Sequence, residues 1–302
     1  MRKLYISLLT ALMVFTFLST TAYAWIALAT VNRIEQIRLS ATSNTDLEIS
    51  LDGIDYYTSL DKEMLDLKVA SNFKFNEVTS LDGITFKDNR FNDVNGRANN
   101  DYLSVRFYFR TSTRYREIHL ADNIVNADYN NVPTSGTFIS SKGVSWSPSV
   151  DYLYGPNETV KKDEKRIYYA KDAMRVSFYN PNTNESKIFD LSGNEERGYG
   201  KSFGATDYLN KVLNEDNKAK TGPKTIYELS QFSETDPYSI TDNSRILILE
   251  QTNEKNTDGR YFYKGEIVMN IWLEGWDADA FDAIQGDHLK MQFMFRAVMT
   301  KQ

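Results

Sequence analysis

Three aspartates near the end of the chain form the first group of residues that could bind a metal ion. Asp277, Asp279 and Asp282 stand where a short helix is expected to begin after Gly275. Carboxylate oxygens are the ligands that calcium prefers in proteins. The same positions also suit acids that cap a helix and complement its dipole, each by about 0.3–1 kcal/mol. Both interpretations stay open, and capping is the simpler one.

The remaining residue types give little support for catalysis. The two histidines, His119 and His288, fall on the polar positions of predicted strands, which predicts solvated side chains. The chain has no H-E-x-x-H motif, no G-x-S-x-G motif and no cysteine. It therefore lacks the usual signatures of zinc proteases, of α/β-hydrolases and of thiol enzymes. The sequence predicts no enzyme, no catalytic residue and no cofactor except the possible calcium. A hydrolase built from scattered carboxylates is the least favoured alternative.

Tyrosines in or near predicted loops are candidates for stacking on sugars or for a protein interface. They are Tyr56, Tyr57, Tyr152, Tyr154, Tyr168, Tyr169 and Tyr199. Tyrosine also suits half-exposed strands, so a purely structural role is the simpler interpretation. A sugar-binding surface module is kept as an alternative function.

Strands with one buried face must position these residues. In the clearest one, Leu103, Val105, Phe107 and Phe109 alternate with polar or charged neighbours, and residues 37–41 and 288–295 show the same period of two. Helical patterns are few and short, at 205–215, at 226–232 and after Gly275. No fixed-period repeat is present. The sequence predicts an all-β protein, an antiparallel jelly-roll-like β-sandwich with long loops and a few short helices.

The N-terminal residues predict export. Arg2 and Lys3 precede an apolar run at 4–17, and Ala22-Tyr23-Ala24 has the form of a signal-peptidase site. We expect residues 1–24 to be a signal peptide and 25–302 to form one β-sandwich domain. The rival interpretation is an uncleaved anchor, because apolar residues continue to Ala29, enough to cross about 30 Å of hydrocarbon.

Charge and cysteine content narrow the setting. Removing Arg2 and Lys3 from the 35 basic residues leaves 33 against 41 acidic ones, which argues against nucleic acid and anionic membrane surfaces as partners. Membrane contact is then expected only through an uncleaved signal. An exported chain without cysteine uses no disulfides, which favours a Gram-positive bacterium. The expected location is secreted or at the cell surface.

Two stretches resemble a known group of proteins. Ala22-Tyr23-Ala24-Trp25, followed by the strand Ile37-Arg38-Leu39-Ser40, resembles the signal region of Firmicute proteins processed by a SipW-type signal peptidase, such as TasA and the camelysins. The stretch 271–279, Ile-Trp-Leu-Glu-Gly-Trp-Asp-Ala-Asp, with the strand at 288–295, is similar to the ending of exported proteins of that group. Together these cover about 60 of the 302 residues.

The resemblance implies a jelly-roll subunit of a biofilm fibre, in which an N-terminal strand completes the sheet of the next subunit. The corresponding segment here is 25–41, with Ile34, Ile37, Leu39 and Ala41 as the polymerisation residues. We therefore expect an exported surface or extracellular-matrix structural protein that assembles with itself or with other matrix proteins. The alternative is a carbohydrate-binding or adhesive module that binds surface glycans through loop tyrosines, with calcium as a possible ligand.

Overall fold

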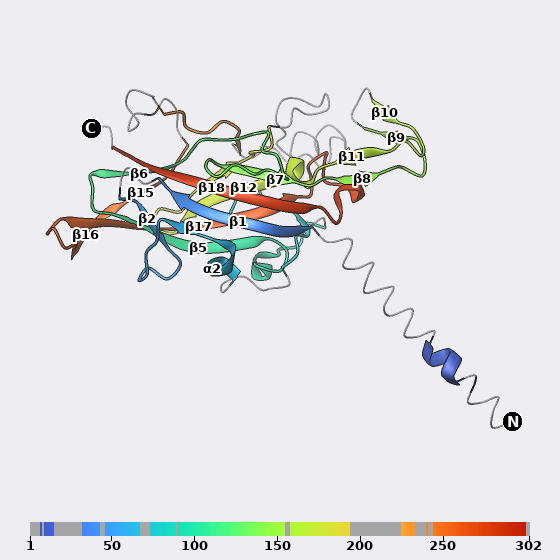
Figure 1. Ribbon diagram of the computed structural model, residues 1–302, viewed down its shortest axis with the longest axis horizontal. Coiled ribbons are helices and arrows are strands. Elements are labelled where there is room, and N and C mark those ends of the chain that lie inside the picture. Colours follow the sequence, from blue (N-terminus) through green and yellow to red (C-terminus); the bar gives the residue numbers. More distant parts are fainter. Residues whose placement is uncertain are drawn as a thin grey trace.

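Alternating apolar and polar residues form strands along most of the described chain. The computed structural model describes residues 7, 9–14, 32–42, 46–66, 73–88, 90–154, 158–193, 225–232, 240 and 244–299. Two large sheets pack face to face (Figure 1), which confirms the predicted all-β sandwich. The predicted signal peptide and the first part of the predicted donor segment lie largely outside the described residues; 9–14 are helical and exposed.

The first sheet has six strands in the order β15, β6, β18, β1, β3, and β7 also pairs with β18. They are β1 (Arg33–Ala41), β3 (Ser59–Leu60), β6 (Tyr115–Leu120), β7 (Phe138–Ser141), β15 (Arg245–Ile248) and β18 (His288–Met299). β1 lies along one side of β18, and β7 and β6 follow one another along the other. The β1–β18 pair is parallel, an exception to the predicted antiparallel order.

The second sheet has eight strands in the order β14, β13, β12, β17, β5, β2, with β16 and β4 also paired to β17. They are β2 (Glu48–Ser50), β4 (Glu77–Val78), β5 (Leu103–Thr111), β12 (Met174–Asn180), β13 (Glu185–Phe189), β14 (Thr225–Ile226), β16 (Glu250–Lys255) and β17 (Tyr261–Glu274). The long β17 is central because β12 and β5 pair with it on opposite sides, both antiparallel.

Two small two-stranded sheets form a lobe at one end of the sandwich (Figure 1). They pair β8 (Val144–Trp146) with β11 (Arg166–Tyr168) and β9 (Tyr152–Leu153) with β10 (Thr159–Val160). Short helical turns are α2 (Lys62–Asp66), η2 (Asn95–Arg97), η3 (Ala170–Ala173) and η5 (Asp282–Ile284).

One of the three predicted helices is wrong, and another is reduced to a single turn. Residues 226–232 are not helical, because Ile226 pairs with Phe189 in the sheet and Ser230 and Phe232 form bridges. The sheet overrides a weak local propensity. The helix expected after Gly275 is only the 3₁₀ turn η5. The pattern at 205–215 lies outside the described residues.

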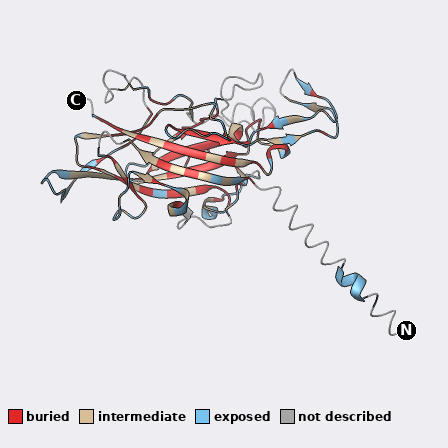
Figure 2. Ribbon diagram, in the orientation of Figure 1, coloured by how far each residue is buried: buried red, intermediate tan, exposed pale blue. Residues whose placement is uncertain are grey.

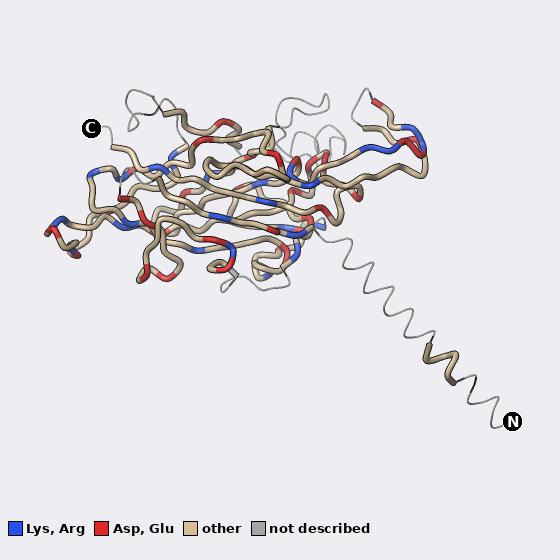
Figure 3. Tube along the Cα trace, viewed as in Figure 1, with Lys and Arg blue, Asp and Glu red and all other residues tan. Residues whose placement is uncertain are grey.

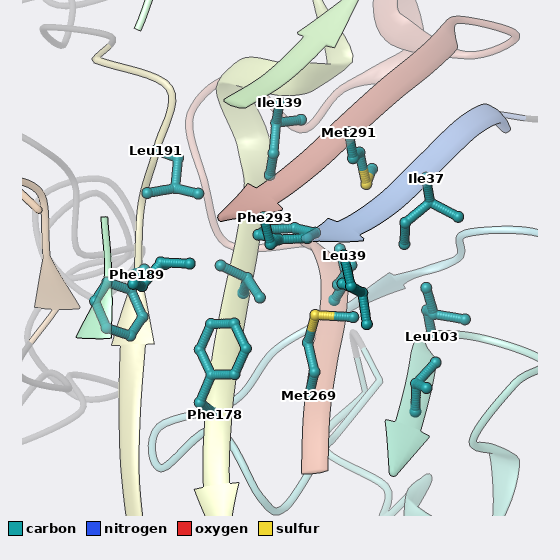
Figure 4. Close-up of a cluster of buried hydrophobic side chains, with 14 of the residues drawn as sticks. Ile37, Leu39, Leu103, Ile139, Phe178, Phe189, Leu191, Met269, Met291 and Phe293 are labelled. Carbon is teal, nitrogen blue, oxygen red and sulfur yellow. The ribbon is translucent and has the colours of Figure 1, made fainter. Parts of the chain in front are cut away.

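Side chains from the inner faces of both sheets make one continuous core. Figure 2 shows the buried residues in red along the central strands. In Figure 4, Phe293 of β18 lies toward Phe178 of β12, and Met269 of β17 and Ile37 and Leu39 of β1 belong to the same cluster. A second, smaller cluster covers the outer face of the eight-stranded sheet around Trp272 and Phe86. The far half of β17 is therefore buried on both faces.

A five-residue sequence, Ser-Leu-Asp-Gly-Ile, occurs at 50–54 and again at 80–84, and both copies fold into the same turn. In each, the serine hydroxyl accepts the glycine N–H at 2.9 Å, and the aspartate Oδ1 accepts the isoleucine N–H at 2.8 Å. The glycine has a positive φ in both copies, a conformation that side chains with a Cβ rarely adopt. The local sequence therefore produces one turn in two different places.

Candidate functional site

The strand predicted to take part in assembly, β1, occupies a place in its own sheet. Its parallel register on β18 runs from Arg33 opposite His288 to Ala41 opposite Phe295. Among the described residues, the other side of β1 pairs only with β3, around Leu39 and Ser40. Figure 1 shows β1 in blue beside β18 in red. β1 is therefore an edge strand over most of its length, with backbone groups on one side that no described strand pairs with.

The four predicted polymerisation residues already serve the core of their own domain. Ile37 and Leu39 are 4% and 0% exposed. Ile34 and Ala41 are partly buried and pack against the same core. Because these side chains are occupied in place, β1 must leave its sheet before it can complete another one.

The start of β1 is fastened to a buried aspartate, Asp287. The Asp287 N–H donates to Asn32 Oδ1 at 2.9 Å, and the Arg33 N–H donates to the Asp287 carbonyl at 3.0 Å. The Asp287 carboxylate in turn accepts the N–H groups of Gly143 and Ala170, each at 2.8 Å. Asp287 thus holds the turn between β7 and β8 and the start of η3 through its carboxylate, and the start of β1 through its backbone.

A polar contact on the outer face of the sheet also holds the start of β1 in place. The Glu35 carboxylate of β1 accepts the Tyr129 hydroxyl and His288 Nδ1, the latter at 2.5 Å. The hydrogen bond from Tyr129 is the largest cause that lowers the pKa of Glu35, and His288 and Lys290 act in the same direction. Sequence reasoning missed Glu35, Tyr129 and Asp287, because their partners are distant in the chain and no local motif marks them.

The three candidate calcium ligands do not converge. Asp277 is 3% exposed and pairs with the buried Arg175, which also lies 3.2 Å from Asp190. Burial raises the pKa of Asp277 to about 6, against the effect of Arg175. Asp279 is buried beside Tyr154, whereas the carboxylate of Asp282 accepts Gln285 Nε2 at the surface. In the described part of the chain no three acids or histidines are placed to hold a metal ion.

His119 contradicts the prediction of a solvated histidine. It is 1% exposed, because the chain around Ser230 and Ser244 covers the outer face of β6. Its Nδ1 lies 3.0 Å from Ser230 Oγ, and burial lowers its pKa to about 3. The ring is neutral at pH 7, so its 3.6 Å approach to Glu117 is not an ion pair. His288, in contrast, lies at the surface.

Most of the loop tyrosines have occupied ring faces. Tyr152, Tyr154 and Tyr168 contact one another, Trp146 and Phe281 in the lobe of β8 to β11. The guanidinium of Arg110 lies 4.1 Å above the ring of Tyr56. Tyr57 and Tyr169 are exposed, and Tyr199 lies outside the described residues. These contacts stabilise the lobe, and the faces of the clustered rings are already occupied by one another.

A groove of about 620 Å³ opens between the edges of the two sheets, where β15 faces β12 and β13. Its lining includes Phe178, Lys187, Arg245, Leu247, Glu250 and Lys264. Arg245 faces Glu117 at 3.6 Å and Lys264 faces Glu254 at 2.6 Å, so these cations already have partners. Figure 3 shows the same mixing of basic and acidic residues over the strands and loops in view. The charges that line the groove therefore do not indicate which class of ligand it would bind.

Comparisons of the chain with protein-family models, with curated proteins and with solved structures find no match. Among the helices of the described residues, none has the length and apolar character required to span a bilayer. The geometry of β1 is therefore the feature from which a function can be argued.

Proposed function

We propose that this protein is an exported surface or matrix protein whose copies assemble by exchanging β1. The observation that carries the proposal is the position of β1. Among the described strands of the sandwich it comes first in the chain, it contributes Ile37 and Leu39 to the core, and it pairs along its length with β18 and only around Leu39 and Ser40 with the short β3. β1 can therefore leave its sheet at the loss of its pairing with β18 and of the short pairing with β3.

Exchange replaces contacts with identical ones in another copy. When β1 leaves, β18 presents an edge of unpaired N–H and C=O groups and the core loses two apolar side chains, which is costly. The β1 of a second copy restores all of these interactions. Because donor and acceptor are different surfaces, the contact is head-to-tail and can extend into a filament. Neighbouring copies are the proposed partners, with other matrix proteins as further ones.

Export is part of the proposal and rests on the sequence. The basic start, the apolar run at 4–17 and Ala22-Tyr23-Ala24 support cleavage after residue 24, and the resemblance to SipW-processed proteins such as TasA supports the same location. The mass of the protein recovered from the culture medium tests this. A mature N-terminus at Trp25 is expected, and a chain that keeps Met1 would argue for a tethered protein.

A reversible crosslink tests the exchange. Ser40 of β1 and Ser59 of β3 lie directly opposite each other in the antiparallel pair. The neighbouring pair is joined by a hydrogen bond from the Ala41 N–H to the Thr58 carbonyl. The chain has no cysteine of its own. The double variant Ser40→Cys, Ser59→Cys places two thiols at a pair with suitable spacing for a disulfide. We expect the oxidised variant to remain monomeric in electron microscopy, and the reduced variant to form filaments like the unmodified protein.

A second crosslink serves as the control. Ser145→Cys with Ile167→Cys joins antiparallel partners of β8 and β11, away from β1, and should leave assembly unchanged. Assembly of the oxidised Ser40–Ser59 variant at the normal rate would exclude exchange of β1. Strictly monomeric unmodified protein at high concentration, with and without seeds, would exclude assembly itself.

A further inference from the structure

The outer face of β1 has one side chain that connects it to two other parts of the domain. We propose that Glu35, together with Tyr129 and His288, forms a latch that sets how often β1 separates from β18. The latch matters biologically only if the proposed exchange of β1 occurs, but its opening can be measured in a single copy of the chain.

The three groups of the latch come from three separate places. Glu35 belongs to β1, Tyr129 to the loop before β7, and His288 to the start of β18. Only Glu35 moves when β1 leaves. Both hydrogen bonds of its carboxylate must therefore break before the first half of β1 can separate, whereas the second half is held by the core and by β3.

The receiving side of the latch is fixed independently of β1. Lys290 Nζ donates to the backbone carbonyl of Tyr129 at 3.0 Å and lies 4.4 Å from the centre of its ring. These contacts keep the hydroxyl of Tyr129 in position whether or not Glu35 is present. A carboxylate that returns, from the same copy or from another, meets donors that are already placed, which favours reclosing.

The latch depends on the charge of Glu35. An ionised carboxylate only accepts hydrogen bonds, so both Tyr129 and His288 Nδ1 must present a proton to it. Tyr129 chiefly, then His288 and Lys290, lower the pKa of Glu35, while partial burial opposes them. Burial, the hydrogen bond to Glu35 and the charges of Glu35 and Asp287 raise the pKa of Tyr129. With the pKa lowered in the docked state, the latch is complete above the usual value of 4.5 and is lost as the pH falls through the docked value.

Hydrogen exchange of the full mature chain, measured by mass spectrometry on dilute monomer, tests the latch. Tyr129→Phe removes only the hydroxyl, and Glu35→Gln removes the charge with little change of shape. Each should speed exchange at residues 33–38 about fivefold, the effect of one partly exposed charge-assisted hydrogen bond. Exchange in β5 should not change. Tyr179→Phe is the matched control, because it removes a hydroxyl that donates to Asn184 on the other sheet.

The outcomes separate the latch from global stability and from assembly. After correction for intrinsic rates, the unmodified protein should approach the exchange of Glu35→Gln as the pH falls through the lowered pKa of Glu35, whereas the variant should show no such change. Unchanged exchange at 33–38 in both variants, or an equal acceleration of β5, would overturn the latch. If the oxidised Ser40–Ser59 variant assembles normally, the proposed exchange fails, and the monomer measurement still decides the latch.

Discussion

The two Ser-Leu-Asp-Gly-Ile turns have the same local hydrogen bonds but very different surroundings. The turn at 50–54 lies at the surface, and a Cβ added to Gly53 would meet nothing closer than the ring of Tyr108 at 3.6 Å. The turn at 80–84 is pressed onto the outer face of β12, where a Cβ on Gly83 would meet Ser177 Cβ at 2.6 Å. The Gly83 carbonyl also accepts Ser177 Oγ at 2.6 Å and Asn270 Nδ2 at 2.9 Å.

This difference teaches that identical sequence can serve as a simple surface turn or as part of the packing. The turn at 80–84 introduces the segment that covers Trp272 and buries the outer face of β17. The turn at 50–54 joins β2 to the region of β3, next to β1, and its glycine leaves room for a Cβ. The backbone is therefore less closely packed at Gly53 than at Gly83.

The largest difference in loss of stability is expected between Gly83→Ala and Gly53→Ala. Both place a Cβ at a positive φ, which costs about 1 kcal/mol. Gly83→Ala adds an overlap with β12, so its free energy of unfolding should fall by about 3 kcal/mol in total. Urea denaturation of the two variants measures both losses. Equal losses would show that the tight contact at Gly83 does not exist.

A double variant should locate the source of that loss. Ser177→Gly removes the Cβ that the new methyl group of Gly83→Ala would meet. The two changes together should therefore destabilise the protein by about 1–2 kcal/mol less than the sum of the single changes. Gly53→Ala combined with Ser177→Gly is the control and should be additive, because Gly53 packs against Tyr108 instead.

Removing the aspartate side chain should give a smaller difference in stability between the two turns. The Asp82 carboxylate accepts the N–H groups of Ile84 and Thr85 and the Thr85 hydroxyl, so Asp82→Ala should cost about 1 kcal/mol. The exposed Asp52 accepts two N–H groups and the Ser50 hydroxyl, and its loss should matter less. Unfolding curves at pH 7 compare the two, and a larger effect of Asp52→Ala would reverse the predicted ranking.

The same aspartates predict the direction of the pH dependence. The N–H groups of Ile54 and Asp55 lower the pKa of Asp52. In Asp82 burial raises the pKa, but the donors of Thr85, Ile84 and Ser80 together lower it by more. Both folded pKa values lie below 3.8, so the ionised forms stabilise the turns above that value and the contribution is lost as the pH falls through the folded pKa. Stability measured from pH 5 to pH 2 should therefore fall less steeply in Asp82→Asn than in the unmodified protein. An identical slope would contradict this.

The smallest effect is expected from exchanging the residue after the pentapeptide. Thr85 donates its hydroxyl to Asp82 at 2.7 Å, whereas the side chain of Asp55 at the equivalent position has no hydroxyl to donate. Asp55→Thr should slightly raise the thermal midpoint by adding this bond to the exposed turn. The reverse change, Thr85→Asp, brings a second carboxylate next to Asp82 and should lower the midpoint.

Local patterns in the sequence were sufficient for the strands and the fold class. The alternation at 103–109 and at 288–295 matches β5 and β18, because side chains on opposite faces of a strand meet opposite environments. The same alternation led to a wrong prediction for His119, which was expected to be solvated. Its polar position is on the outer face as expected, but that face is covered by the chain near Ser230, which lies more than a hundred residues away.

Only part of the candidate site could be predicted from the sequence. Ile37 and Leu39 were identified as the apolar face of a strand, and their burial agrees with that. Asp277 was assigned to a cap or to calcium, but it pairs with Arg175, because a buried carboxylate needs an opposite charge and no sequence spacing reveals which one. The parallel pairing of β1 with β18 was not predicted, since register between distant strands leaves no local trace.

By itself, the sequence determined the properties that depend on neighbouring residues: which segments are strands, which of their faces are apolar, and the turn that Ser-Leu-Asp-Gly-Ile adopts twice. The tertiary structure alone decided what each of those elements touches. It placed β1 against the last strand, buried His119, and made one copy of the turn tight and the other loose, because contacts between distant residues follow from the packing of whole sheets and not from any short stretch of chain.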